Sequence, residues 1–234
     1  MSKWPKPLPT LTDEQKRIKD DWMMHWLTIL PNRYRAIEQF NHGYPAKYSR
    51  PGDRVLEIGA GLGEHIKYEK LENGDYHALE LRPEIAREMQ RRHPEVHVTV
   101  ANCEQSIPFS NGFFDRVIAI HMLEHLPNLP AALREIHRTL KPGGIFCVVI
   151  PCEGGLAYAV ARFISSKRIF ERRYKMSYDF CIRSEHVNEP REILEELAPL
   201  FETRDRSFFP LKAPFVTMNL AIGLLLTPRA QRQR

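Results

Sequence analysis

The chain has 234 residues, of which 43% are apolar and 27% charged, and its formal net charge is +5. This length suits one sizeable α/β domain, or one domain with an elaborated lid, because two independent domains would each be small. Four cysteines form no CxxC pair and have no histidine at zinc-finger spacing, which disfavours a zinc finger or a disulfide framework. The mild basicity by itself indicates only a solvated surface.

No segment predicts a secretion signal or a membrane anchor. The first nine residues lack the apolar core of a signal peptide. The longest mostly apolar stretch, residues 213–226, is interrupted by Pro214, Thr217 and Asn219 and is too short to span a bilayer. The expected location is therefore the cytoplasm.

Residues 1–50 predict an extended arm followed by helices. Residues 1–10 carry three prolines, and Thr12 then opens a helix with Gln15 as its capping-box partner. Four apolar residues fall close to one face of this helix: Ile18, Trp22, Trp26 and Ile29. Pro31 is expected to break the helix or to start the next one, which runs to about Phe40, and residues 41–45 are expected to form a turn.

From residue 51 the pattern becomes that of an α/β domain. Apolar strands are predicted at residues 54–58, 75–80, 96–100, 115–120 and 145–150, with helices near 82–92 and 129–140, the latter stopping at 141–144. Such alternation predicts a parallel sheet buried on both faces. Residues 151–188 form a long insertion, followed by a helix at 190–200, strands near 202–209 and 215–226, and a tail at 229–234 that is expected to be disordered.

A glycine-rich turn after the first predicted strand is the strongest functional signal. Its glycines, Gly59, Gly61 and Gly63, are small enough for a ligand to touch the backbone at the carboxyl end of the strand. A dinucleotide site would need Gly-x-Gly-x-x-Gly, but position 64 is glutamate, which would repel a pyrophosphate at the helix start. Glu64 is harmless beside a cofactor that carries a sulfonium and an ammonium group.

Two further segments lie at the ends of neighbouring strands. Glu80 ends the second predicted strand, where a carboxylate can accept hydrogen bonds from both hydroxyls of a ribose. The segment Asn102-Cys-Glu-Gln-Ser-Ile-Pro-Phe109 follows the third, and His121-Met-Leu-Glu-His125 follows the fourth. The residues predicted to contact a cofactor, besides the turn, are Glu80, Leu81, Asn102, Cys103, Glu104 and His121.

Residues 50–151 resemble the class I S-adenosylmethionine-dependent methyltransferases, of the group called type 11. The resemblance implies that the segment from Glu57 to Gly63 holds the methionine part of S-adenosylmethionine (SAM) and that Glu80 binds the ribose. Asn102 stands where the family usually has an aspartate near the adenine amino group; its amide carbonyl can still accept that hydrogen bond. Because the Leu-Glu-His-Leu segment is common to members with different substrates, His125 is interpreted as structural or cofactor-side.

The family fold is an α/β, Rossmann-like sheet of seven mostly parallel strands, with the last strand antiparallel and helices on both faces. On this prediction residues 1–50 form a helical cap over the cofactor, and residues 51–234 form the SAM-dependent methyltransferase domain. The insertion at 151–188 would be a lid over the substrate. Six basic residues between Arg162 and Lys175 suggest an anionic acceptor or carrier, or an approach to an anionic membrane.

The predicted reaction is in-line methyl transfer to a small molecule, by O- or N-methylation, of a glycan or natural-product type. A base is needed only if the nucleophile carries a proton. His186 is the first candidate and His121 the second, because histidine titrates near neutral pH. Glu185 is not expected to face His186, so a more distant carboxylate or a backbone carbonyl would orient the imidazole. No metal is expected.

Three alternatives stay open. The glycine spacing disfavours a nicotinamide oxidoreductase, and a catalytically inactive SAM-binding protein remains possible on sequence alone. A nucleic-acid methyltransferase is less favoured, because His-Met-Leu-Glu stands where base-modifying enzymes often have Asn-Pro-Pro-Tyr or Asp-Pro-Pro-Tyr. The sequence does not name the acceptor or the oligomeric state.

Overall fold

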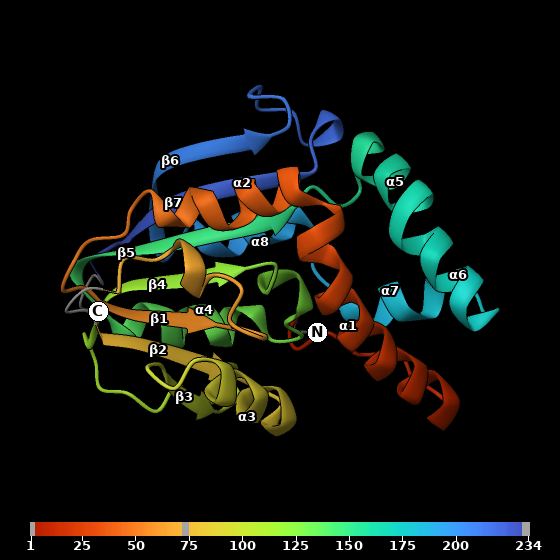
Figure 1. Ribbon diagram of the computed structural model, residues 1–234. Coiled ribbons are helices and arrows are strands. Elements are labelled where there is room, and N and C mark those ends of the chain that lie inside the picture. The colour runs from red at the N-terminus through yellow and green to blue at the C-terminus, as the bar shows by residue number, and fades with distance from the viewer. Residues whose placement is uncertain (1–2, 72–74, 231–234) are drawn as a thin grey trace.

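The computed structural model describes residues 3–71 and 75–230 and shows a seven-stranded sheet in the order β3-β2-β1-β4-β5-β7-β6 (Figure 1). Strands β1 to β5 are parallel, whereas β7 is antiparallel to both β5 and β6. The predicted sheet with an antiparallel last strand is confirmed. The strands are β1 (Arg54–Ile58), β2 (Asp75–Glu80), β3 (His97–Val100), β4 (Phe114–Ile120), β5 (Leu140–Pro151), β6 (Phe201–Phe209) and β7 (Ala221–Pro228).

The central strands are apolar throughout because helices cover both faces of the sheet. Val117, Ile118, Val148 and Val149 are fully buried in the adjacent strands β4 and β5. Helix α2 (Arg35–Ala46) covers one face, and α4 (Leu129–Thr139) with α8 (Pro190–Leu197) covers the other, while α3 (Pro83–Arg92) packs beside β2 and β3 (Figure 1). This layering leaves the carboxyl ends of the parallel strands at one edge of the molecule.

The N-terminal helices differ from the prediction at two prolines. Helix α1 (Asp13–Arg33) continues through Pro31 and breaks only at Tyr34; the side chain of Ile29 lies outside the described residues. The predicted turn at 41–45 is wrong, because α2 runs through it to Ala46. Pro45 sits in the last helical turn, and the Asn41 amide nitrogen donates to Glu38 at 3.1 Å inside the helix.

The insertion after β5 folds into helices. An almost continuous run consists of α5 (Leu156–Arg162), a π-helical turn (Phe163–Lys167) and α6 (Arg168–Tyr174), and α7 (Asp179–Glu185) follows it. Helix α1 packs on this run, with the Trp22 ring 5.3 Å from Phe170 and 6.0 Å from Tyr178. The predicted cap and lid therefore share one apolar cluster; their roles as cap and lid stay predictions.

Two strand boundaries also differ from the prediction. The segment 141–144 lies within β5, where the pairing with β4 is irregular between Phe114 and Arg116. Strand β7 begins at Ala221 rather than near 215, because residues 216–218 form a 3-10 turn. Asn219 holds that loop: its amide donates to the carbonyls of Ala213 and Phe215, each at 2.9 Å. Most of the tail predicted to be disordered, residues 231–234, lies outside the described residues.

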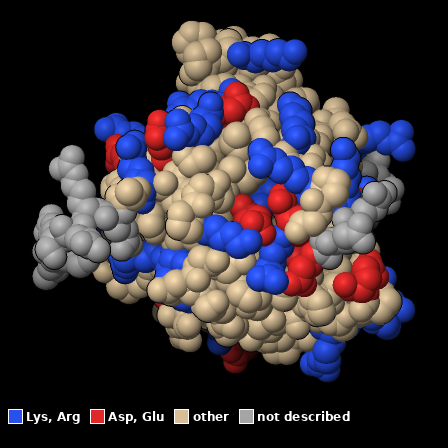
Figure 2. Space-filling model, turned by 90° about the vertical axis from the view of Figure 1, so that its left-hand side faces the viewer, with Lys and Arg blue, Asp and Glu red and all other residues tan. Residues whose placement is uncertain are grey.

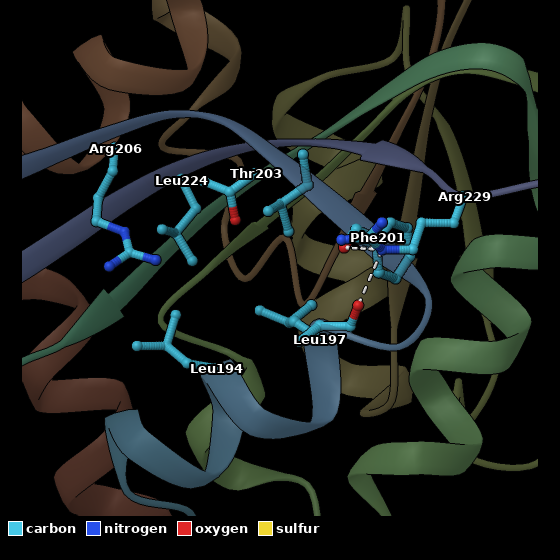
Figure 3. A pocket seen from close by; sticks show the side chains of 9 residues that line it. Leu194, Leu197, Phe201, Thr203, Arg206, Leu224 and Arg229 are labelled. Carbon is cyan, nitrogen blue, oxygen red and sulfur yellow. Dashed lines mark hydrogen bonds between the residues drawn. The ribbon is translucent and has the colours of Figure 1, made fainter.

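Two surface features lie away from the carboxyl ends of the parallel strands. On the face at their amino ends, basic and acidic side chains stand beside one another (Figure 2), as in the pairs Arg54–Asp75 at 3.0 Å and Lys141–Asp115 at 2.6 Å. A small pocket lies between α8 and strands β6 and β7, where Arg229 donates to the carbonyl of Phe201 at 3.0 Å (Figure 3). None of the predicted site residues lines this pocket.

Candidate active site

The glycine turn follows β1 and passes under the loop after β4. Gly59, Gly61 and Gly63 all have positive φ, at 70°, 55° and 86°, a region that side chains of L-residues rarely adopt. The Gly59 amide donates to the carbonyl of Leu79 at 2.8 Å. A Cβ at Gly59 would lie 2.7 Å from Cγ of Met122, so the absence of a side chain there lets the two loops touch.

Gly61 differs from its neighbours because a Cβ there would meet no close contact. The nearest atom to a Cβ built at Gly61 is Cδ2 of Leu27, at 3.8 Å. A Cβ at Gly63, in contrast, would lie 2.6 Å from the His93 ring. Gly63 therefore serves packing, whereas Gly61 leaves room beside the backbone. Leu27 belongs to α1, so the N-terminal helix lies over this turn.

Glu80 joins the end of β2 to the glycine turn. Its side chain is 6% exposed, and its carboxylate accepts the Gly61 amide at 3.2 Å and the Leu81 amide at 3.0 Å. The side chain of Leu81 is 59% exposed at the same edge. A buried carboxylate beside an exposed apolar side chain and an open backbone turn is suited to a ligand with both a hydroxylated and an apolar part.

Glu57 lies within β1 and is buried against β2. Its Oε2 accepts a hydrogen bond from the Tyr76 hydroxyl at 2.8 Å. Burial raises the pKa of Glu57 to about 8, so this carboxyl group is mostly protonated at neutral pH. Its predicted contact with the cofactor stays a prediction; in the structure it ties β1 to β2.

The segment after β3 is a hydrogen-bonded loop. The side-chain carbonyl of Asn102 accepts the Glu104 amide at 2.8 Å. The Glu104 carboxylate in turn accepts the amide of Asn128, the residue that precedes α4. Cys103 is buried, which raises the pKa of its thiol to about 12. Asn102 and Glu104 thus shape the loop, and Cys103 stays a neutral packing group.

Histidines and carboxylates gather after β4. His121 directly follows the strand with φ 48°, and Nδ1 of its ring lies 3.3 Å from Oε1 of Glu124. Glu124 is 1% exposed, and within the described residues neither of its carboxylate oxygens accepts a hydrogen bond. Burial by itself would raise the pKa of Glu124, but His121 and His125 lower it overall. The Glu124 carboxyl group is therefore ionised, and two histidines neighbour its negative charge.

His186 is oriented by a carboxylate from the end of β5. Its Nδ1 lies 2.6 Å from Oε2 of Glu153, whose Oε1 accepts from Arg162 at 2.5 Å. The His125 ring meets the His186 ring edge to face at 4.9 Å. The carboxylate that was expected to orient His186 from a distance is therefore Glu153.

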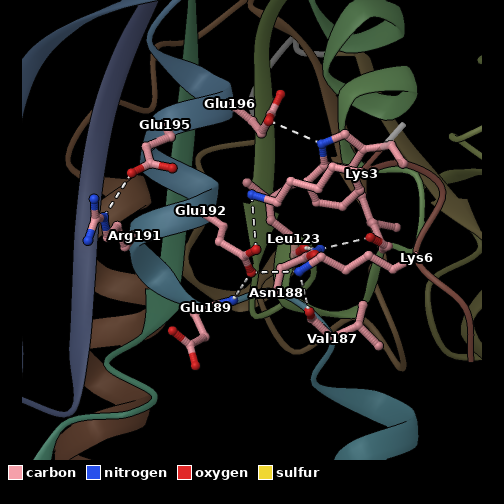
Figure 4. A network of polar contacts seen from close by, with 12 residues as sticks. Lys3, Lys6, Leu123, Val187, Asn188, Glu189, Arg191, Glu192, Glu195 and Glu196 are labelled. Atoms are coloured by element: carbon pink, nitrogen blue, oxygen red, sulfur yellow. Dashed lines mark hydrogen bonds and ion pairs between the residues drawn. The ribbon is translucent and has the colours of Figure 1, made fainter. Parts of the chain in front are cut away.

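The N-terminal arm fixes the segment that carries His186 (Figure 4). The Lys6 ammonium donates to the Val187 carbonyl at 2.8 Å and to Glu192 at 2.6 Å. The Asn188 amide donates to the carbonyl of Leu123 at 2.8 Å. Residues 3–10, which have no helix or strand, are thus tied to the loop after β4 and to α8.

The predicted residues fall into two groups. Gly61, Glu80 and Leu81 gather around the ends of β1 and β2, while His121 and His186 lie at the ends of β4 and β5. Met122 links the groups, because it follows His121 and packs on Gly59. Sequence analysis missed Glu124 and Glu153, although both lie within four residues of a strand end, which is where sites of parallel sheets form.

Comparison with known proteins identifies the domain. Residues 56–148 match the model of a methyltransferase domain family. The chain is 30% identical over 164 residues to a probable phthiotriol/phenolphthiotriol dimycocerosates methyltransferase 2 of Mycobacterium ulcerans, covering 64% of this chain and 60% of that protein. It is 31% identical over 118 residues to a fatty-acid O-methyltransferase of Mycolicibacterium smegmatis, covering 49% and 42%. The chain thus spans less than two thirds of either relative.

A solved structure supports the same assignment at the level of fold. A TehB-like SAM-dependent methyltransferase from Corynebacterium glutamicum superposes with a TM-score of 0.60 at 15% identity, over 92% of this chain and all of that one. The glycine turn fits SAM, because a Cβ at Gly61 would meet no atom closer than 3.8 Å and Glu64 pairs with Lys67 where a dinucleotide would place a pyrophosphate. Residues 56–148 thus match a methyltransferase domain, and the chain has the fold of a SAM-dependent methyltransferase.

Proposed function

We propose that this protein transfers a methyl group from SAM to a hydroxyl group of a small, largely apolar molecule, with His186 as the general base. The observation that carries the proposal is the 2.6 Å pairing of His186 with Glu153, at the same sheet edge as the open glycine turn. The M. smegmatis relative, by its name, O-methylates fatty acids, which supports an apolar acceptor.

The residues around β1, β2 and β3 would hold the cofactor. The turn at Gly61 leaves room for its methionine part, the Glu80 carboxylate can accept from its ribose, and the loop at 102–104 lies where the adenine would be placed. SAM supplies a methyl group already activated by the positive charge of its sulfur. The protein therefore has to align the acceptor, which can contribute roughly 7–11 kcal/mol to lowering the barrier.

His186 has the arrangement of a general base. With Nδ1 bound to Glu153, the neutral ring carries its proton at Nδ1 and presents Nε2 as the proton acceptor. The Glu153 carboxylate fixes that tautomer and stabilises the imidazolium that forms when the acceptor hydroxyl loses its proton. Arg162, paired with the other oxygen of Glu153, holds this carboxylate in place.

An open groove beside Glu153 is suited to the acceptor. It is lined by Glu153, Gly154 and Gly155 after β5, by residues of α8, and by Val216 and Thr217 of the β6–β7 loop. Pro190 and Leu194 contribute apolar surface from α8. Most of the exposed surface of the groove is apolar, and Glu189, Arg191 and Glu195 add charged side chains at its α8 wall. His186 does not line the groove itself and adjoins it through its pairing with Glu153. Such a groove would take an apolar molecule with a polar group near Glu153.

The test measures formation of S-adenosylhomocysteine with a panel of long-chain alcohols, alkylated phenols and fatty acids. On an alcohol or phenol that is turned over, His186→Ala should lower kcat by at least about 100-fold, while SAM affinity by calorimetry stays within about threefold. Glu153→Gln should show a smaller loss of kcat, because the ring keeps its place but loses the stabilised cation. His97→Ala, at an exposed histidine on β3, is the control. Retention of most activity by His186→Ala would contradict the base assignment.

A further inference from the structure

The helical run after β5 exposes an apolar stripe. Leu156, Val160, Phe163 and Ile164 are 68%, 52%, 67% and 63% exposed. Their spacing of four, seven and eight residues places them on one side of the helix. The stripe faces away from α1, because the buried residues of this run, such as Phe170, pack on Trp22 instead. Four large exposed apolar side chains at helical spacing form a contiguous patch, which marks an interaction surface.

The loop between β6 and β7 extends this patch. Phe215, which precedes the 3-10 turn that contacts α5, is 59% exposed, and Met218, the last residue of that turn, is 55% exposed. The turn lies directly against the start of the helix, since a Cβ at Gly155 would be 2.6 Å from the Val216 carbonyl oxygen. Two separate segments of the chain therefore present apolar side chains at one place.

Unpaired basic residues continue the stripe. Within the described part of the chain, the side chains of Arg168, Arg172 and Lys212 are exposed and form no ion pair. Other cations of the same run are paired, such as Lys167 with Asp179 at 3.5 Å and Arg173 with Asp21 at 3.1 Å. The π turn between α5 and α6 reduces the rotation per residue, which brings Arg168 and Arg172 back toward the side of Ile164.

We infer that the helical run of residues 156–174, with the loop at 211–218, docks on an anionic lipid surface. Apolar side chains beside cations match both parts of such a surface, the acyl region and the acidic headgroups. A second copy of the chain would bring Arg168 and Arg172 against cations of the same sign. The face at the amino ends of the strands shows the contrast, because there cations stand beside carboxylates (Figure 2).

The docking surface goes beyond the proposed reaction and has a consequence for it. The groove beside Glu153 is lined by Gly155, Val216 and Thr217, which adjoin the exposed residues Leu156, Phe215 and Met218. Docking would therefore bring the groove close to the lipid, where an apolar acceptor resides. This consequence rests on the proposed function, whereas binding to lipid requires neither cofactor nor acceptor.

The test is co-sedimentation of the full chain with vesicles, without cofactor. Binding is expected to vesicles of phosphatidylcholine with 30% phosphatidylglycerol, to be weaker on phosphatidylcholine alone, and to fall as salt rises. The double variant Phe163→Ser/Ile164→Ser should weaken the partition constant at least about tenfold, because it removes two inserting side chains. Arg168→Glu/Arg172→Glu should also weaken it at least about tenfold.

Matched control variants distinguish binding through this surface from a general effect of losing apolar area or positive charge. Leu8→Ser replaces an apolar residue in the arm that is 53% exposed, and Arg50→Glu/Lys70→Glu makes the same charge change near the amino ends of the strands. Both variants should bind vesicles as the wild type does. Circular dichroism checks that each variant is folded. No vesicle binding by the wild type, or an equal loss in the controls, overturns the inference. So does analytical ultracentrifugation showing a dimer that the apolar variants dissociate while vesicle binding is unchanged.

Discussion

Gly61 shows how a single residue separates packing from binding. The glycines at 59 and 63 contact neighbouring side chains closely, whereas a Cβ at Gly61 would make only an ordinary contact, 3.8 Å from Leu27. The positive φ of Gly61 nevertheless makes any side chain there strained. Sequence spacing alone could not distinguish these three positions.

We expect Gly61→Val to lower SAM affinity at least about tenfold while the protein remains folded, because the branched side chain occupies the space beside the backbone. Calorimetry gives the affinity and a thermal melt gives the stability. Gly52→Val is the matched control: Gly52 has φ 83° and open surroundings but precedes β1 at the far edge of the sheet. Equal losses of affinity in both variants would show that strain, rather than occupied space, is responsible.

Glu57 should make stability depend on pH. Burial raises the pKa of Glu57 from an ordinary 4.5 to about 8, so the folded protein binds this proton more tightly than the unfolded chain does. The stability that the bound proton contributes is complete below pH 4.5 and is lost as pH rises through 8. Glu57→Gln cannot titrate and keeps an oxygen for the Tyr76 hydroxyl. The variant should gain at least about 1 kcal/mol of stability over the wild type between pH 5 and pH 8.5.

Urea unfolding of the wild type and Glu57→Gln across that pH range measures the gain. Glu202→Gln, at a half-exposed side chain on β6, should show no such trend. If the curves of Glu57→Gln and the wild type run parallel, Glu57 is ionised in the folded protein.

At the scale of elements, one ion pair joins the lid segment to the loop after β4. His125 Nδ1 lies 3.3 Å from Glu185 at the end of α7. Burial alone would lower the pKa of His125, but Glu185 and Glu124 raise it overall. Burial likewise opposes the effects of His125 and of Lys19, whose ammonium lies 2.7 Å from Glu185, and together these two cations lower the pKa of Glu185 to about 2. Both charged forms are therefore favoured by folding.

The pair should stabilise the fold within a defined pH window. The stability contributed by protonated His125 is complete below pH 6.5 and is lost as pH rises through its raised pKa. The stability contributed by ionised Glu185 is complete above pH 4.5 and is lost as pH falls toward 2. Glu185→Gln should therefore cost about 1–3 kcal/mol between pH 4.5 and 6.5, the usual range for hydrogen bonds to charged groups. Thermal melts across pH 3–9 measure this; a constant difference would mean that the pair is not charged as described.

At the scale of the whole molecule, α1 and the helices after β5 form one layer over the carboxyl ends of the strands (Figure 1). Such a layer can order a bound cofactor and be ordered by it. Within the described residues, no helix has both the length and the apolar composition to cross a bilayer.

SAM or S-adenosylhomocysteine at about 100 times Kd should raise the Tm by roughly 5–10 °C. At that concentration a ligand selective for the native state adds about 2.7 kcal/mol to the free energy of unfolding. NAD at the same concentration should not, because Glu64 stands where its pyrophosphate would lie. Differential scanning fluorimetry compares the two ligands. A shift with NAD and none with SAM would contradict the cofactor assignment.

The sequence was sufficient for the parts of this protein that depend on local pattern. Continuous apolar strands alternating with amphipathic helices predicted the parallel sheet, and the glycine spacing with Glu80 predicted which strand ends form the site. The rules for proline and turn residues failed at Pro31 and at residues 41–45, where the chain stays helical.

Only the tertiary structure decided which side chains meet. Glu153 and His186 are 33 residues apart in sequence, and Lys6 reaches Val187 across 181 residues, so no local pattern could pair them. The exposed apolar stripe at residues 156–164 also could not be predicted from the sequence. The spacing of apolar residues along a helix is the same whether that face is buried or exposed. The sequence thus determined the scaffold and predicted the strand ends at which a cofactor would bind, and long-range packing determined the histidine–carboxylate pairs and the exposed apolar face.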